Sequence, residues 1–159
     1  MHDTKAAHGM NLLLWRHADA EDGIPDAGRA LTAKGLKQAK QVAQWLQPRL
    51  PKDCLILASP AKRAQQTAQA LDLPYTTEPR VGVHADAAGI VAASGWPRRQ
   101  GTVIVVGHQP TLGQLAAALL SGEAAGWTIK KGALWWFSIR ADADSGRAVL
   151  KAVVSPDLL

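Results

Sequence analysis

Residues 12–17 carry the stretch Leu12-Leu13-Leu14-Trp15-Arg16-His17. Its four apolar residues predict a short buried strand, and Arg16 and His17 follow at the carboxyl end of that strand. In open α/β sheets, ligands bind in the crevice outside the carboxyl ends of the strands. The same pattern recurs where the run 102–106 leads into Gly107-His108. We therefore predict that the two histidines and the arginine form a site that can hold and attack a phosphoryl group.

Outward from these two strands, strand and helix patterns alternate along the chain. Further strands are predicted at 55–58, at 75–77 as a short edge strand, and at 133–139 and 148–154 as a closing hairpin that turns through Asp144-Ser145-Gly146. One helix is predicted from Thr32, its N-cap, to 47, and another from Ser59-Pro60 to 71 with Pro60 at the first helical position. Two more are predicted at 87–93 and from Pro110 to 120. This alternation indicates an α/β fold, a mainly parallel sheet flanked by helices on both faces.

One face of the first helix carries its apolar residues at helical spacing, so we expect these side chains to be buried. They are Leu36, Ala39, Val42, Ala43 and Leu46.

Length and composition favour one domain with a mobile N-terminal extension. We assign residues 1–10 to the extension and 11–159 to the domain. The apolar runs are too short to span a bilayer, and the extension lacks the apolar core of a secretory signal. Cys54 is the only cysteine, so no intramolecular disulfide can form, and we expect a cytoplasmic protein. The formal net charge of +5 suits anionic partners.

Arg63 falls in the first turn of the helix after the second strand, so it faces the same sheet edge as Arg16, His17 and His108. A neutral imidazole is a competent nucleophile, and we expect His17 to attack phosphorus and become a phosphohistidine. The planar guanidinium groups of Arg16 and Arg63 match the phosphoryl oxygens. His108 would donate to the same oxygens, most effectively when protonated. This chemistry needs no metal or cofactor, and His84 is expected to take no part.

Three ordered motifs resemble the histidine phosphatase (phosphoglycerate mutase-like) superfamily. They are Arg16-His17-Ala18, the block Ser59-Pro60-Ala61-Lys62-Arg63-Ala64-Gln65-Gln66-Thr67-Ala68, and Val105-Val106-Gly107-His108-Gln109-Pro110. The short chain and the segments 16–20 and 26–35 resemble SixA-type phosphohistidine phosphatases. The resemblance implies a minimal phosphoglycerate mutase-like fold with no cap domain. It also implies His17 as nucleophile, with Arg16, Arg63 and His108 completing the phosphate pocket, Arg29 at the rim, and Ser59 either binding phosphate or capping its helix.

The sequence departs from the family pattern at two points. Ala18 replaces the usual glycine, a mild change if its φ is negative. Larger relatives carry a strong general acid, for which only Asp86 and, less well, Asp19 are candidates here. A departing imidazole depends less on such an acid than an alkoxide does, which favours phosphohistidine as the substrate.

We therefore expect a metal-independent phosphatase that acts on phosphohistidine of a protein, for example a histidine phosphotransfer domain. The alternatives are a small-molecule phosphomonoesterase with the same pocket, or a catalytically inactive module that binds phosphate or nucleic acid. The net charge of +5 and Arg98-Arg99 beside Trp96 support nucleic-acid binding, but no extended basic and aromatic stripe accompanies them. Neither a membrane nor a nucleic acid is an expected partner.

Overall fold

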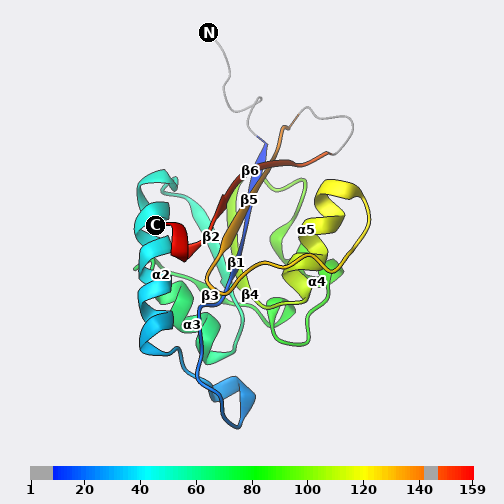
Figure 1. The fold of residues 1–159 in the computed structure, drawn as a ribbon. Helices are drawn as coiled ribbons and strands as arrows, with labels where there is room; N and C mark the ends of the chain where they lie inside the picture. Colours follow the sequence, from blue (N-terminus) through cyan, green and yellow to red (C-terminus); the bar gives the residue numbers. More distant parts are fainter. Residues whose placement is uncertain (1–8, 142–146) are drawn as a thin grey trace.

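The computed structural model describes residues 9–141 and 147–159. Its centre is a six-stranded sheet with the order β3-β2-β4-β1-β5-β6 (Figure 1). The first four strands in this order run parallel, and β5 and β6 pair antiparallel. The strands are β1 (Met10–Arg16), β2 (Cys54–Ala58), β3 (Thr76–Thr77), β4 (Gly101–Gly107), β5 (Leu134–Ile139) and β6 (Val149–Val154). The expected mainly parallel sheet is therefore confirmed.

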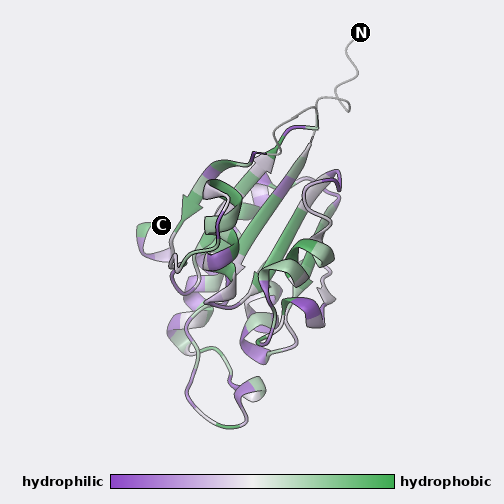
Figure 2. Ribbon diagram, turned by 90° about the vertical axis from the view of Figure 1, so that its right-hand side faces the viewer, coloured by the Kyte–Doolittle hydropathy of each residue, from purple (hydrophilic) through white to green (hydrophobic). Residues whose placement is uncertain are grey.

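Helices cover both faces of the sheet, also as expected. On one face, α2 (Ala33–Leu46) and α3 (Lys62–Gln69) pack against Leu13, Ile104 and their neighbours. On the other face, α4 (Ala87–Ser94) and α5 (Thr111–Ser121) pack against Leu12, Val105 and their neighbours. The strands between these layers are largely hydrophobic, as Figure 2 shows. Short 3-10 turns are η1 (Asp26–Gly28), η2 (Gln47–Arg49), η3 (Pro79–Val81) and η4 (Pro156–Leu158).

The start of α2 agrees with its sequence signal, but its apolar face differs at one position. Thr32 is the N-cap, and its hydroxyl accepts from the backbone N–H of Gly35 at 2.9 Å. The expectation that Leu36 is buried is wrong, because its side chain is 51% exposed. Gly35 is buried instead, and a Cβ atom there would lie 1.9 Å from the carbonyl oxygen of Asp19. This close approach brings α2 against the chain that follows β1.

The predicted position of Pro60 inside a helix is wrong. α3 begins at Lys62 with Ala61 as N-cap, and it ends at Gln69, two residues before the predicted end. The reason is local: the Ser59 hydroxyl accepts from the backbone N–H of Ala61 at 3.1 Å, which makes the segment a turn. Pro110 likewise lies at the N-cap of α5 rather than inside it.

The predicted N-terminal extension, residues 1–10, overlaps the first strand of the structure. Met10 already belongs to β1 and is only 1% exposed, and the carbonyl oxygen of Gly9 accepts from the N–H of Gly101 at 3.3 Å. Residues 1–8 and the predicted turn Asp144-Ser145-Gly146 lie outside the described residues. Among the residues that the structure describes, no helix combines the length and the apolar character needed to cross a membrane.

Candidate active site

The carboxyl ends of β1 and β4 bring His17 and His108 together. Their ring centroids are 5.2 Å apart, and both side chains are buried. Arg63, the second residue of α3, reaches the same place: its Nε donates to His17 Nε2 at 3.3 Å. These residues are separated by more than 40 positions in sequence, and the parallel strand order places them at one edge, as the motif spacing predicts.

Two hydrogen bonds fix the tautomer of His17. Its Nδ1 lies 2.7 Å from the carbonyl oxygen of Ala18, which can only accept, so the proton is on Nδ1. Nε2 therefore carries a lone pair, consistent with its contact to the Arg63 N–H group. The residue that replaces the family's glycine has no left-handed backbone, since Asp72 is the only described non-glycine residue with positive φ. Ala18 thus serves the site with its carbonyl group.

Both histidines are neutral in the unliganded site. Burial lowers the pKa of His17 to about 4, and the positive charges of Arg63, Arg16 and Arg29 act in the same direction. Burial also lowers the pKa of His108 to about 3, together with the neighbouring His17 and Arg63. His17 is therefore in the form that can attack at neutral pH. In the free site the lowered pKa of His108 favours its neutral form, and the prediction that it donates to a phosphoryl group stays a prediction.

Arg16 has an unused donor in a buried position. Its Nη1 donates to the carbonyl oxygen of Ile129 at 2.9 Å, whereas its Nε is buried without a partner among the described residues. A buried N–H group without an acceptor is costly, so such a donor is normally used by a ligand or water. Burial also lowers the pKa of this guanidinium from its usual value. This donor therefore marks a place for an anion beside His17.

The segment before β5 holds the end of β1 through backbone groups. The N–H of Gly132 donates to the carbonyl oxygen of His17 at 3.0 Å, and Trp15 Nε1 donates to the carbonyl oxygen of Gly132 at 3.0 Å. From α3, the Thr67 hydroxyl accepts from the N–H of Ala18 at 3.1 Å and donates to the carbonyl oxygen of Arg63 at 2.8 Å. The backbone at His17 and Ala18 is thus fixed from both sides.

Asp26, which the sequence interpretation missed, connects the two outer arginines. Its carboxylate accepts from Arg63 Nη2 at 3.1 Å and from Arg29 Nη1 at 3.1 Å, and its carbonyl oxygen accepts from Arg63 Nη1 at 2.9 Å. These hydrogen bonds, first from Arg29 and then from Arg63, lower the pKa of the carboxyl group. The sequence signal that could have pointed to Asp26 is its position in the motif segment 26–35. Arg29 Nε also donates to the carbonyl oxygen of Glu21 at 2.7 Å, and the position of Arg29 at the rim of a phosphate pocket stays a prediction.

Ser59 lies next to His108, with its hydroxyl 2.7 Å from His108 Nε2. The two candidate acids are engaged elsewhere. Asp19 accepts from the Thr32 hydroxyl at 2.8 Å and from Lys131 Nζ at 3.2 Å, and these hydrogen bonds lower its pKa, which opposes a role as proton donor. Asp86 is the N-cap of α4 and accepts from the N–H of Gly89 at 2.7 Å.

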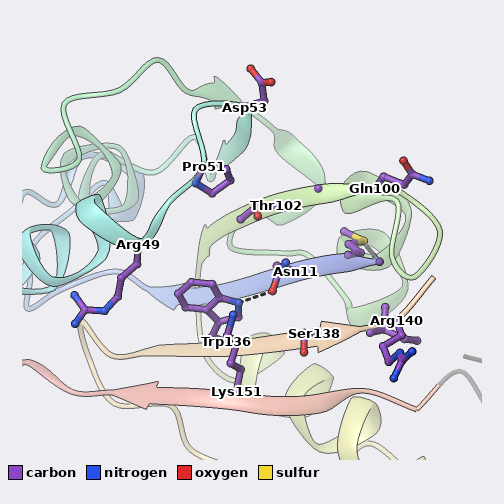
Figure 3. Close-up of a pocket in the computed structure, with 14 residues that line it drawn as sticks. Asn11, Arg49, Pro51, Asp53, Gln100, Thr102, Trp136, Ser138, Arg140 and Lys151 are labelled. Carbon is purple, nitrogen blue, oxygen red and sulfur yellow. Dashed lines mark hydrogen bonds between the residues drawn. The ribbon is translucent and has the colours of Figure 1, made fainter. Parts of the chain in front are cut away.

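Two cavities lie at opposite edges of the sheet. One, of about 590 Å³, is lined by Arg63, Ser59 and the loops around them. The other, of about 780 Å³, lies at the amino ends of β1 and β4 and is drawn in Figure 3, where Trp136 Nε1 donates to Asn11 Oδ1 at 2.8 Å. None of the predicted site residues lines this larger cavity. Of these two cavities, only the smaller one is lined by residues predicted for the site, Ser59 and Arg63.

Two further observations bear on whether a metal ion or a nucleic acid could bind. Within residues 9–141 and 147–159, no three His, Cys, Asp or Glu side chains form a group that could hold a metal ion. Trp96 is buried in the core between α4 and the sheet, so it offers no stacking surface next to Arg98 and Arg99.

Comparisons with known proteins agree with this geometry. The model of the histidine phosphatase superfamily (branch 1) matches residues 12–82. The phosphohistidine phosphatase SixA of Escherichia coli (strain K12) is 32% identical over 123 residues, which cover 72% of this chain and 76% of that protein. The chain belongs to the histidine phosphatase superfamily.

Solved structures share the fold of this chain. The protein histidine phosphatase SixA complexed with tungstate superimposes with a TM-score of 0.77 at 26% identity, covering 94% of this chain and 99% of that one. A phosphoserine phosphatase mutant from Entamoeba histolytica superimposes with a TM-score of 0.69 at 17% identity, covering 94% and 99%. The chain therefore has the phosphoglycerate mutase-like fold of SixA, and its activity is that of a phosphatase, a hydrolase of this superfamily.

Proposed function

We propose that the protein removes phosphate from phosphohistidine on another protein, without a metal, through a phosphohistidine intermediate on His17. The observation that carries this proposal is the orientation of the His17 ring. Its Nδ1–H is held by the carbonyl oxygen of Ala18, and its Nε2 lone pair faces the Arg63 guanidinium. A neutral nucleophile beside a phosphate-binding group can attack phosphorus in line and divide one difficult displacement into two easier ones.

The charge of the transferred phosphoryl group would be balanced by arginine. The unused Nε of Arg16 and the guanidinium of Arg63 supply donors to its oxygens. His108 and Ser59 supply a further hydrogen-bonding pair from the β4 side. Arg29 raises the positive potential at the rim. Preorganised donors of this kind are commonly the largest contribution to catalysis, about 2.7–4 kcal/mol for one donor.

The substrate class is supported by the relatives. One is named a phosphohistidine phosphatase, and one structural neighbour is a protein histidine phosphatase that holds tungstate, a tetrahedral oxyanion like phosphate. The carboxylates considered as acids are engaged in capping or ion pairing, so neither is free to protonate an alkoxide leaving group. The cytoplasmic location expected from the single cysteine stays a prediction.

The test is phosphate release from a phosphorylated histidine phosphotransfer domain in EDTA. We expect release with wild type and none with His17→Ala, and we expect trapped 32P on the wild-type protein at His17. Lys40→Gln, an exposed change on α2, is the matched control and should behave as wild type. Turnover of small phosphate esters without turnover of the phosphoprotein would favour a small-molecule phosphomonoesterase. Phosphate binding without any turnover would favour an inactive binding module.

A further inference from the structure

The cavity beside Arg63 has the right position to receive the group that leaves phosphorus. Two of its lining residues also contact the catalytic histidines: Arg63 is bonded to His17, and Ser59 is bonded to His108. Away from them, Pro60, Pro79 and Val83 form an apolar part of its wall. A phosphoryl group held by Arg16 and Arg63 would therefore direct its substituent into this space.

The reaction needs a proton in this cavity, and His17 cannot supply it. The nucleophilic Nε2 of His17 carries no proton, and the Nδ1 proton is held by the carbonyl oxygen of Ala18. Attack by His17 therefore releases no proton for the leaving group. His108, the other buried imidazole, is neutral in the free site and bonded to Ser59. A separate donor must face the leaving atom for a basic leaving group to depart.

His84 is the titratable group that remains. Three titratable side chains line the cavity: Asp26, Arg63 and His84. Asp26 is ion-paired with Arg63 and Arg29, which lowers its pKa, and an arginine does not lose its proton in proteins. Within residues 9–141 and 147–159, His84 has neither a hydrogen-bond nor an ion-pair partner, and it is an exposed residue that lines the cavity.

The charged residues next to His84 in sequence do not compete for the same role. Glu78 and Arg80 are bonded to each other at 2.7 Å, and Asp86 caps α4. None of these three lines the cavity. Histidine is also the side chain best suited to give and take protons near neutral pH.

On this basis we propose that His84 is the general acid and base of the reaction, a proposal that rests on the phosphatase function above and names its proton donor. In the first step the His17 Nε2 lone pair forms a bond to phosphorus while the bond from phosphorus to the substrate nitrogen breaks, and protonated His84 gives its proton to that nitrogen. In the second step water attacks phosphorus, the bond to Nε2 breaks, and neutral His84 takes the proton that water loses. Each turnover consumes one water and restores protonated His84.

The test is a series of aryl phosphates whose phenols differ in acidity, together with the phosphohistidine protein. We expect the loss in kcat/KM of His84→Gln to grow as the phenol becomes less acidic, reaching the roughly 10²–10⁴-fold typical of a lost general acid. His84→Gly should regain rate on basic leaving groups when imidazole is added. Asp86→Asn is the matched control, because it removes a neighbouring titratable group while asparagine still caps α4, and its leaving-group dependence should equal that of wild type.

An equal loss across all phenols in His84→Gln, no loss at all, or a steeper dependence in Asp86→Asn would overturn the assignment of His84. The aryl phosphates decide this independently of the natural substrate. If wild type hydrolyses them but leaves the phosphohistidine protein intact, the proposed substrate class fails while the leaving-group dependence still decides the role of His84.

Discussion

The two buried neutral histidines should make the unliganded protein lose stability in mild acid. The pKa of His17 is lowered to about 4 and that of His108 to about 3, whereas both have the ordinary histidine value of 6.5 in the unfolded chain. Because the folded-state pKa lies below the unfolded one, the unfolded chain binds more protons as the pH falls. The stability is fully present above pH 6.5 and is lost progressively below it.

The size of this loss follows from the linkage relation. At pH 5.5 each histidine favours the unfolded chain by about 1.4 kcal/mol, so the two together lower the free energy of unfolding by about 3 kcal/mol relative to pH 7.5. The carboxyl groups with lowered pKa, Asp19, Asp26 and Glu78, contribute only at lower pH, because their ordinary values are 3.8 to 4.5. The interval from pH 7.5 to 5.5 therefore isolates the histidines.

The assay is urea unfolding at pH 7.5 and 5.5 in a phosphate-free buffer, with the free energies taken at a common slope. His108→Asn removes one of the two proton-binding groups, so it should reduce the difference between the two pH values to about half, about 1.4 kcal/mol. Equal stability of wild type at both pH values would refute the conclusion that these rings are neutral because of burial.

Three further changes test the positions of the residues around His17. Arg63→Lys keeps a positive charge but loses the Nε–H on His17, and should lower kcat on an aryl phosphate about 10²–10³-fold; a loss below tenfold would contradict this role. Thr67→Val leaves the N–H of Ala18 buried without an acceptor, and should cost about 1–3 kcal/mol in urea unfolding; unchanged stability would show that this bond contributes nothing. Asp26→Asn removes a carboxylate 3.1 Å from Arg63 Nη2, so phosphate should inhibit more tightly, by about 0.2–1 kcal/mol for a partly exposed pair. Weaker inhibition would mean that Asp26 chiefly orients Arg63.

The strand-end histidines could be predicted because their signals are local. A run of apolar residues predicts a strand buried on both faces, and the polar side chain that follows at once marks the carboxyl end of that strand. Both Leu12–His17 and the residues from β4 to His108 follow this pattern. The parallel order of β1 and β4 then brings these ends together.

Two features that the sequence analysis missed or mispredicted, Asp26 and Leu36, depend on contacts between distant segments, whereas Pro60 depends on a local one. The Asp26–Arg63 ion pair joins residues 37 positions apart, and a pair at this separation cannot be predicted from the spacing of residues in the sequence. Leu36 has the correct helical spacing for burial, but the close approach of Gly35 to the carbonyl group of Asp19 turns the helix so that Leu36 faces solvent. Proline is common at a helix start, but the hydrogen bond from the N–H of Ala61 to the Ser59 hydroxyl makes the segment around Pro60 a turn.

The support that the segment 129–133 gives to the end of β1 determines which of its side chains can be exchanged. Arg16 and His17 are held there by carbonyl and N–H groups of Ile129, Gly132 and Ala133, and every residue type has a carbonyl group. Gly132 is the one of these three positions where the residue type also matters, because its φ of +74° is a conformation that favours glycine, and a Cβ atom there would lie 3.0 Å from Pro156 Cγ. Substitutions at Ile129 and Ala133 can keep their carbonyl groups in place as long as the path of the main chain is kept. A substitution at Gly132 is instead expected to shift the N–H group that donates to His17.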